Sequence, residues 1–365
     1  MSAGPLIPPD YLEWAKTRAE SRFNLATSGV LPLPFRELGA TLDDLELTGP
    51  AAYGYEPLQQ ALAARCDVPA ESVVAATGTT QANHLAMAAV IGPGDQVVME
   101  HPLYQPLLAA ARQIGAEVRL FQRRESDGFR IDLEEVRRAV GPRTRLIVLT
   151  NLHNPTGGRI DEATLAEIGA IARAVGARVL VDEVYLEMLW VEGERGPSGP
   201  RSAFHLGPEF ITTASLTKAY GLGGLRCGWI LAEPGLAAKM WSLFDLFLGS
   251  AAHPAERLSV LALSKIGAIA DRARTLLQTN RALLNRFLDT RDDLEVTRPG
   301  VGTVVFPRWR GGDVAPMCTR LRDTYETTVV PGVFFGVPER FRLGIGGETA
   351  ILAEGLERLG AALGE

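Results

Sequence analysis

Apolar residues recur through the middle of the chain in short runs that are separated by helical stretches. Six runs of strand length lie at residues 72–76, 96–99, 117–121, 146–150, 178–182 and 210–213. Segments with apolar residues at helical spacing separate most of them, such as 81–90, 103–114, 132–140 and 161–175. Strands that alternate with helices form a mostly parallel sheet covered by helices. The pattern therefore predicts an α/β fold whose ligand site lies at the carboxyl ends of the strands.

The pattern changes after about residue 248. A long helical stretch over 254–288 leads to short strands at 294–297, 302–307 and 341–343 and to a terminal helix over 348–363. Near the other end, an amphipathic helix is expected over 9–22 and a shorter one over 36–46, while 192–202 reads as a surface loop. We expect a large domain over residues 46–250 and a smaller α+β domain built from residues 1–45 and 251–365.

Composition narrows the class of protein. The chain has 365 residues, of which 46% are hydrophobic and 22% charged, as in ordinary globular enzymes. A net charge of −6 argues against a nucleic-acid partner. No apolar run is long enough to span a membrane and no signal peptide is visible, so a cytoplasmic location is expected. The three cysteines, Cys66, Cys227 and Cys318, have no metal-binding spacing, and no metal site is predicted.

Lysine is scarce, which makes Lys218 a candidate for chemistry that needs an amine. Only four lysines occur among 37 Lys and Arg residues. Lys218 closes Ser215-Leu216-Thr217-Lys218 after the strand at 210–213, and Arg226 follows beyond a glycine-rich turn. A desolvated lysine can lose its proton and form a Schiff base with a carbonyl carbon. Ser215 and Arg226 can bind an anion beside it.

Three other strand ends carry polar groups. Gly78-Thr79-Thr80 opens a helix after the first strand, where backbone N–H groups favour a phosphate. Asn154 projects an amide from an Asn-Pro-Thr-Gly turn, and Asp182 ends a buried strand, where a carboxylate needs a positive partner. Tyr185 adds a phenol three residues later. Each feature alone is an ordinary turn or loop residue, but together they predict one site.

These residues closely resemble those of the class I and II aminotransferases, which are fold-type I pyridoxal-5′-phosphate (PLP) enzymes around aspartate aminotransferase. The resemblance covers about residues 54–342. It implies a large domain with a mostly parallel seven-stranded sheet and a smaller α+β domain. It also implies that Lys218 holds PLP as a Schiff base, that Asp182 pairs with the pyridine nitrogen, and that Tyr185 and Asn154 bind the ring's phenolic oxygen. The other cofactor-binding residues would be Gly78, Thr79, Thr80, Ser215 and Arg226 at the phosphate and Tyr104 stacked on the ring.

The resemblance extends to the substrate and to a partner subunit. Arg342, in Phe341-Arg342-Leu343, matches the arginine that binds the substrate α-carboxylate, and is preferred to Arg340. Asn154, Gly29 and Val30 would also line the substrate site, and a homodimer is implied. The tyrosine that the family places five residues before Gly54 falls on Gly49 here. Tyr53 or Tyr55 could take its place.

The predicted function is transfer of an amino group from an α-amino acid to a 2-oxo acid. The same site could support another PLP reaction: β-elimination, racemisation, decarboxylation or cyclisation. Ser215 and Lys218 also satisfy the Ser-x-x-Lys signature of β-lactamase-like enzymes, but the sequence has neither Ser-Asp-Asn nor Lys-Thr-Gly. Residues 221–226 depart from the dinucleotide fingerprint, and too few residues precede Phe23 for the DNA-binding domain of a PLP-sensing regulator.

Overall fold

A seven-stranded sheet forms the centre of the computed structural model, which describes residues 8–50, 52–194 and 200–364. The strand order is β2-β8-β7-β6-β5-β3-β4. The strands are β2 (Val73–Thr77), β3 (Gln96–His101), β4 (Glu117–Gln122), β5 (Thr144–Thr150), β6 (Arg178–Asp182), β7 (Phe210–Ser215) and β8 (Cys227–Leu231).

The direction of the strands brings many chain segments to one edge. Strands β4, β3, β5, β6 and β7 run parallel, and β8 is antiparallel to both β7 and β2. The carboxyl ends of β2, β5, β6 and β7 therefore share an edge with the beginning of β8. In the register of β5 and β6, Thr150 lies beside Asp182. The predicted mostly parallel sheet is confirmed.

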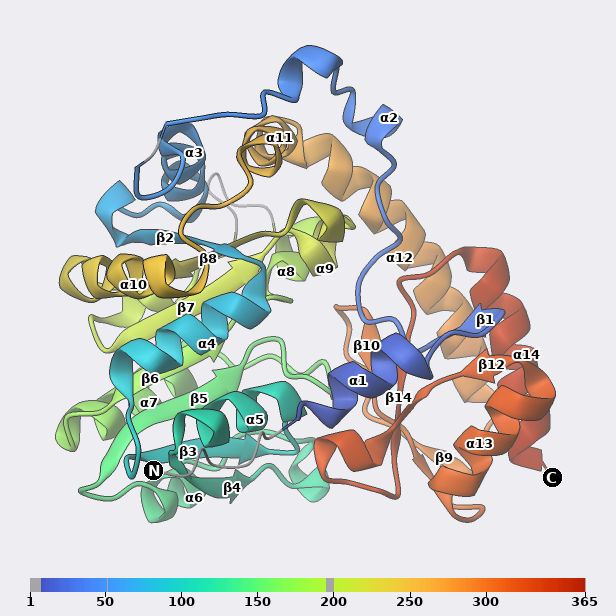
Figure 1. The fold of residues 1–365 in the computed structure, drawn as a ribbon. Coiled ribbons are helices and arrows are strands. Elements are labelled where there is room, and N and C mark those ends of the chain that lie inside the picture. The colour runs from blue at the N-terminus through green and yellow to red at the C-terminus, as the bar shows by residue number, and fades with distance from the viewer. Residues whose placement is uncertain (1–7, 51, 195–199, 365) are drawn as a thin grey trace.

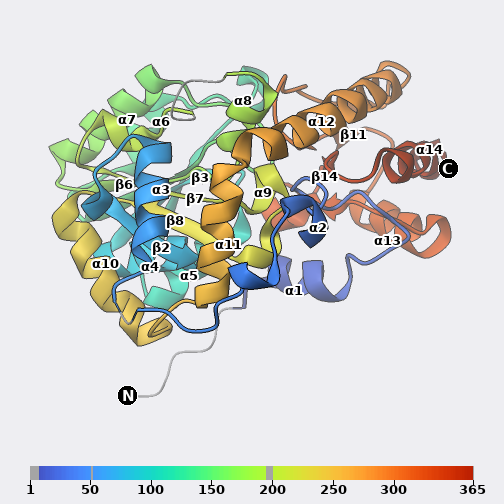
Figure 2. The same ribbon diagram turned by 90° about the horizontal axis from the view of Figure 1, so that it is seen from above.

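Helices cover both faces of the sheet because side chains alternate along each strand. On β5, Leu146 and Val148 pack with α4 (Thr79–Val90), α5 (Gln105–Ile114) and α10 (Pro234–Phe247). Ile147 and Leu149 pack on the other face with α6 (Leu133–Ala139) and α7 (Glu162–Ala174). Figure 1 shows α4, α5 and α10 in front of the sheet, and the turned view of Figure 2 shows the sheet between the two layers. Residues buried on both faces explain the nearly continuous apolar runs of the sequence.

The C-terminal part contains helices and short strands beside the sheet edge (Figure 2). Its elements are α12 (Ile266–Asp289), β9 (Leu294–Glu295), β10 (Val304–Val305), β11 (Arg308–Trp309), α13 (Val314–Tyr325), β12 (Thr327–Thr328), β13 (Val330–Pro331), β14 (Phe341–Gly344) and α14 (Thr349–Gly364). The N-terminal segment joins it, because β1 (Phe23–Asn24) pairs in parallel with β12. This pairing supports the division into two domains that we propose from the sequence.

The remaining helices connect these two parts of the chain or line the sheet edge. They are α1 (Asp10–Thr17), α2 (Phe35–Leu38), α3 (Glu56–Cys66), α8 (Glu187–Glu192), α9 (Thr217–Tyr220) and α11 (His253–Ser264). Figure 1 shows α12 running from α11 toward the C-terminal elements.

Several element boundaries differ from the prediction. The helix expected over 36–46 ends at Leu38, because Gly39 adopts φ 65°, and a separate 3-10 turn follows at Leu42–Asp44. The stretch over 254–288 is two helices, α11 and α12, that meet at Lys265. Helix α1 stops at Thr17, five residues before the predicted end. Strand β8 was not among the predicted strands.

The predicted surface loop over 192–202 is wrong at its two ends. Glu192 is largely buried and forms an ion pair with Arg281 at 2.7 Å, and Ser202 is buried and donates to Glu183 at 2.6 Å. Residues 195–199 lie outside the described part of the chain.

Candidate active site

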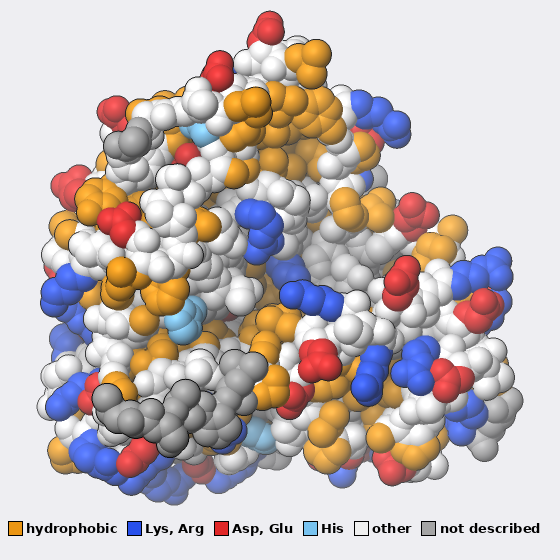
Figure 3. All heavy atoms as spheres, in the orientation of Figure 1, with side chains coloured by type: hydrophobic (Ala, Val, Ile, Leu, Met, Phe, Trp, Pro, Cys, Tyr) orange, Lys and Arg blue, Asp and Glu red, His pale blue; other side chains and the backbone are white. Residues whose placement is uncertain are grey.

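A cleft lies at the shared edge of the strands, between the sheet and the N-terminal residues that join the C-terminal part. Its non-atom space, including the open mouth, is about 710 Å³. Figure 3 shows this side of the molecule hollowed between the two parts. Most of the predicted site residues line the cleft: Thr79, Thr80, Tyr104, Asn154, Asp182, Tyr185, Ser215, Lys218 and Arg226.

Lys218 reaches the cleft from the first turn after β7. Its backbone carbonyl accepts a hydrogen bond from Val30 N at 2.8 Å, which ties the N-terminal segment to the lysine. Burial and the nearby Arg342 charge lower the pKa of the Lys218 amine to about 8, against the opposing effect of Asp182. A substantial neutral fraction near physiological pH follows, and only the neutral amine is a nucleophile.

Asp182 ends β6 on the floor of the cleft. Its Oδ2 accepts from Asn83 Nδ2 at 2.8 Å, and its Oδ1 accepts from Val184 N at 3.0 Å. Asn83 is itself fixed by Thr213, whose hydroxyl donates to Asn83 Oδ1 at 2.6 Å. Burial raises the pKa of Asp182 to about 6, against the lowering effect of these hydrogen bonds. The cleft thus holds a buried carboxylate that a cationic partner would stabilise.

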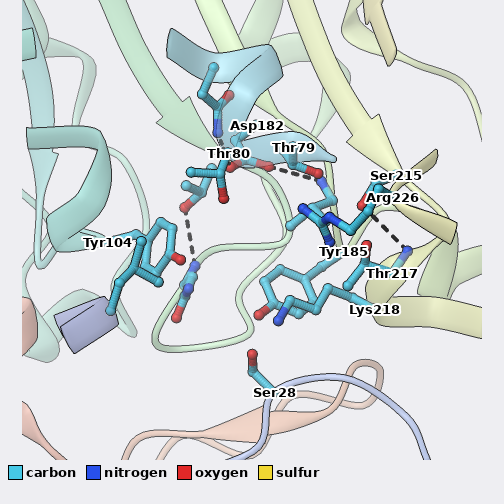
Figure 4. Close-up of a pocket in the computed structure, with 15 residues that line it drawn as sticks. Ser28, Thr79, Thr80, Tyr104, Asp182, Tyr185, Ser215, Thr217, Lys218 and Arg226 are labelled. Carbon is cyan, nitrogen blue, oxygen red and sulfur yellow. Dashed lines mark hydrogen bonds between the residues drawn. The ribbon is translucent and has the colours of Figure 1, made fainter. Parts of the chain in front are cut away.

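The opposite corner is suited to an anion. Helix α4 begins at Thr79, and Arg226 enters the same corner from the start of β8 (Figure 4). Arg226 Nη2 donates to Thr77 O at 2.9 Å, and a Cβ atom added at Gly78 would lie 2.2 Å from that nitrogen. The Thr79 hydroxyl is buried and has no hydrogen-bond partner within the described residues. Free N–H groups, a hydroxyl and a guanidinium therefore converge there.

Two phenols flank the central space. Figure 4 shows Tyr185 beside Lys218 and Tyr104 across the cleft from them. Burial raises the pKa of Tyr185 to about 12 and that of Tyr104 well above its ordinary value. Both hydroxyls therefore keep their protons and can donate hydrogen bonds.

Arg342 lies on β14 and is fully buried. Its Nη1 donates to Asn154 Oδ1 at 2.9 Å, so the arginine is connected directly to a residue of the cleft. Arg340 points elsewhere: it pairs with Glu125 and donates to Phe306 O. Of the two arginines, only Arg342 contacts a residue that lines the cleft.

Several residues in and around the cleft differ from the sequence prediction. Ser28 lines the cleft, whereas Gly29 packs against the Lys218 backbone and Val30 is buried in the core. Tyr53 is 56% exposed and packs against Trp241, and Tyr55 faces His253. The lining residues that the sequence did not point to are Leu12, Asn83, Thr150 and Val184. The substrate roles of Gly29 and Val30 stay predictions.

Comparison with known proteins identifies the family of the chain. The sequence profile described as Aminotransferase class I and II matches residues 45–359. The chain belongs to the class I and II aminotransferases. Capreomycidine synthase from Streptomyces vinaceus is 30% identical over 379 aligned residues, which cover 100% of this chain and 96% of that protein. Arginine–pyruvate transaminase AruH from Pseudomonas aeruginosa is 29% identical over an alignment that covers 74% of this chain and 68% of that protein.

Solved structures agree with the family. A PLP-dependent aminotransferase from Streptococcus suis superposes with a TM-score of 0.89 at 28% identity, covering 100% of this chain and 98% of that one. This class I and II aminotransferase chain has the fold-type I architecture and uses PLP as its cofactor. Within the described ranges, no helix combines the length and apolar character needed to cross a membrane.

Proposed function

We propose that the chain is an aminotransferase that moves the amino group of an α-amino acid to a 2-oxo acid. The observation that carries this proposal is the placement of three groups around one cleft. A buried amine, Lys218, and a buried carboxylate, Asp182, line it, and the guanidinium of Arg342 lies behind Asn154. Amine, counter-ion and carboxylate clamp are the three groups that PLP chemistry on an amino acid requires.

The residues of the cleft fit the cofactor. The corner formed by Gly78, Thr79, Thr80, Ser215 and Arg226 would hold the phosphate, since the orphaned Thr79 hydroxyl and the helix N-terminus both need an acceptor. Asp182 would pair with the protonated ring nitrogen, which relieves the burial of its charge. Tyr185 and Asn154 would donate to the phenolic oxygen, and Tyr104 would stack on the ring. Bound PLP withdraws electrons from the substrate Cα.

Lys218 has two roles in this proposal. Its amine would hold the cofactor covalently. When free, the same amine would act as the base at the substrate Cα, and its lowered pKa of about 8 suits that role. Arg342 would bind the substrate carboxylate and so fix Cα relative to the Lys218 amine.

A second candidate function is a PLP reaction other than transamination. It is kept because capreomycidine synthase, whose similarity covers the whole chain, is named as a synthase. Another PLP reaction on the same residues, such as cyclisation or β-elimination, would use Lys218, Asp182 and Arg342 in the same way. These reactions differ from transamination in the fate of the substrate nitrogen.

Product analysis separates the candidates. The holoenzyme is incubated with L-alanine, L-aspartate or L-arginine, each with and without pyruvate or 2-oxoglutarate. Transamination predicts that a 2-oxo acid and a new amino acid form in equal amounts, and only when an acceptor is present. Ammonia or a cyclic product formed without an acceptor would contradict it. Lys218→Ala protein is the control for uncatalysed reaction.

The proposal includes three further points carried over from the sequence prediction. They are the two-domain division at residues 46–250, a homodimer and a cytoplasmic location. Leu246, Phe247 and Leu248 at the end of α10 are exposed apolar residues, which supports a contact between subunits there.

A further inference from the structure

The hydrogen bonds of Arg342 leave no adjacent pair of free N–H groups that could bind both oxygens of a carboxylate. A guanidinium has five N–H groups. Nη2 donates to Tyr11 OH at 2.8 Å and to Ala26 O at 3.1 Å, so both of its hydrogens are used. Nε has no partner within the described residues. A carboxylate binds in bidentate fashion through Nη2 together with either Nη1 or Nε, so it must displace one partner of Nη2.

Of these two partners, only Tyr11 contributes a side chain, whose torsions can change without moving the backbone. Ala26 contributes a backbone carbonyl in the segment that follows β1. Tyr11 lies on α1, and its ring packs against Tyr104 at 5.5 Å and Phe335 at 6.0 Å between ring centroids. A phenol oxygen makes a weaker hydrogen bond with a guanidinium than a carboxylate does.

The burial of Arg342 explains why its guanidinium needs the Tyr11 hydroxyl when no substrate is bound. The arginine side chain is fully enclosed, so water cannot solvate its charge when no substrate is present. A buried cation without partners is costly. The Tyr11 hydroxyl supplies an acceptor in that state.

We propose that Tyr11 occupies the position of the substrate carboxylate on Arg342 and that the carboxylate displaces its hydroxyl on binding. Tyr11 is then a specificity-determining residue, because only an acceptor stronger than a phenol takes its place. This inference rests on the proposed function, in which Arg342 is the carboxylate clamp.

The test is Tyr11→Phe in the PLP-loaded enzyme. Phenylalanine keeps the ring packing but leaves one Nη2 hydrogen without an acceptor until a carboxylate arrives. We expect KM for the amino donor to fall roughly tenfold while kcat is unchanged. A binding readout independent of turnover is the rise in melting temperature caused by propionate, which should be larger in Tyr11→Phe than in the wild type. Propionamide, which has the same shape without the charge, should produce no such difference.

Two variants separate the possible failures. Trp14→Phe alters a neighbouring aromatic contact of α1 and should behave as the wild type, so an equal effect there would assign the result to α1 packing and overturn the proposal. Arg342→Lys keeps the charge but loses the fork, and should abolish protection by propionate. If Arg342→Lys abolishes protection but Tyr11→Phe responds as the wild type does, the Tyr11 inference is wrong and the clamp stands. If propionate protects wild type and Arg342→Lys equally, the clamp itself is wrong.

Discussion

Gly78 illustrates how single residues shape the anion corner. Its φ of 85° and the 2.2 Å between an added Cβ and Arg226 Nη2 mean that a side chain there would displace the guanidinium. Gly94 has nearly the same backbone angle, φ 86°, but an added Cβ would meet nothing within 4 Å. A side chain at Gly94 would therefore introduce backbone strain alone, whereas a side chain at Gly78 would also disturb the contact with Arg226.

Alanine at these two positions should have different effects on cofactor binding. Both substitutions cost about 1–2 kcal/mol of stability, because alanine disfavours positive φ. Gly78→Ala should also weaken PLP affinity roughly 10- to 100-fold through the loss of a charge-assisted contact, whereas Gly94→Ala should leave it unchanged. Equilibrium titration of the ligand-free proteins with PLP measures this. Equal affinities would show that Arg226 does not bind the phosphate.

The Lys218 amine makes the stability of the ligand-free protein depend on pH. Its pKa falls from 10.5 in the unfolded chain to about 8 in the fold, so the folded state binds fewer protons between these values. The free energy of unfolding therefore rises with pH across that window, by at most about 3 kcal/mol. The free-energy cost of burying the protonated amine is fully present below pH 8.

Lys218→Met tests this effect, since methionine has a similar shape without the charge. Ligand-free Lys218→Met should be more stable than the wild type at pH 7, by about 1–3 kcal/mol, and the gap should shrink as pH rises from 8 toward 10. Urea unfolding at several pH values measures it. Lys239→Met, on the exposed side of α10, is the control and should show a small, pH-independent change. A constant gap for Lys218→Met would contradict the burial of a charged amine.

The residues that the sequence revealed best are those next to strand ends. Asp182, Ser215 and Lys218 were found because an apolar run stops at a polar group. Asn83 and Tyr11 were not, because their contacts join positions 99 and 331 residues apart. Asn83 had one usable signal: it lies one turn after Thr79 on the same face of a predicted helix.

At the scale of elements, the strands and helices of the sheet were predicted where their apolar period was clear. Strand β8 was missed because a glycine-rich turn precedes it directly and Gly228 interrupts its short apolar run. Its antiparallel direction has a functional consequence: the strand begins at the edge where the others end. Arg226, just before it, reaches the cleft for this reason.

Helix boundaries depended on local signals that apolar spacing does not contain. The break at Lys265 interrupts a continuous helical pattern of apolar residues. The Lys265 amine donates to Leu38 O at 2.8 Å, so a contact with a distant part of the chain accompanies the break. Gly39 marks the end of α2 by its left-handed conformation. A glycine after a short apolar run was visible in the sequence, and would have ended that helix earlier.

At the scale of the whole molecule, the cleft depends on segments from across the chain. Helix α1 and Ser28 come from the N-terminal segment, the strand ends come from the sheet, and Arg342 comes from β14. The pairing of β1 with β12 holds the first and last of these together. Apolar periodicity predicts the sheet but not this assembly, and the resemblance to a known family supplied it.

The central claim is that Lys218 alone holds PLP, and borohydride reduction followed by peptide mapping tests it most directly. The holoenzyme is reduced, digested and analysed by mass spectrometry for a phosphopyridoxyl group. The four lysines, Lys16, Lys218, Lys239 and Lys265, lie far apart in the sequence, so their peptides are distinct. We predict one label per chain on the Lys218 peptide and none in Lys218→Ala. A label on another lysine, or no label in the wild type, would contradict the account.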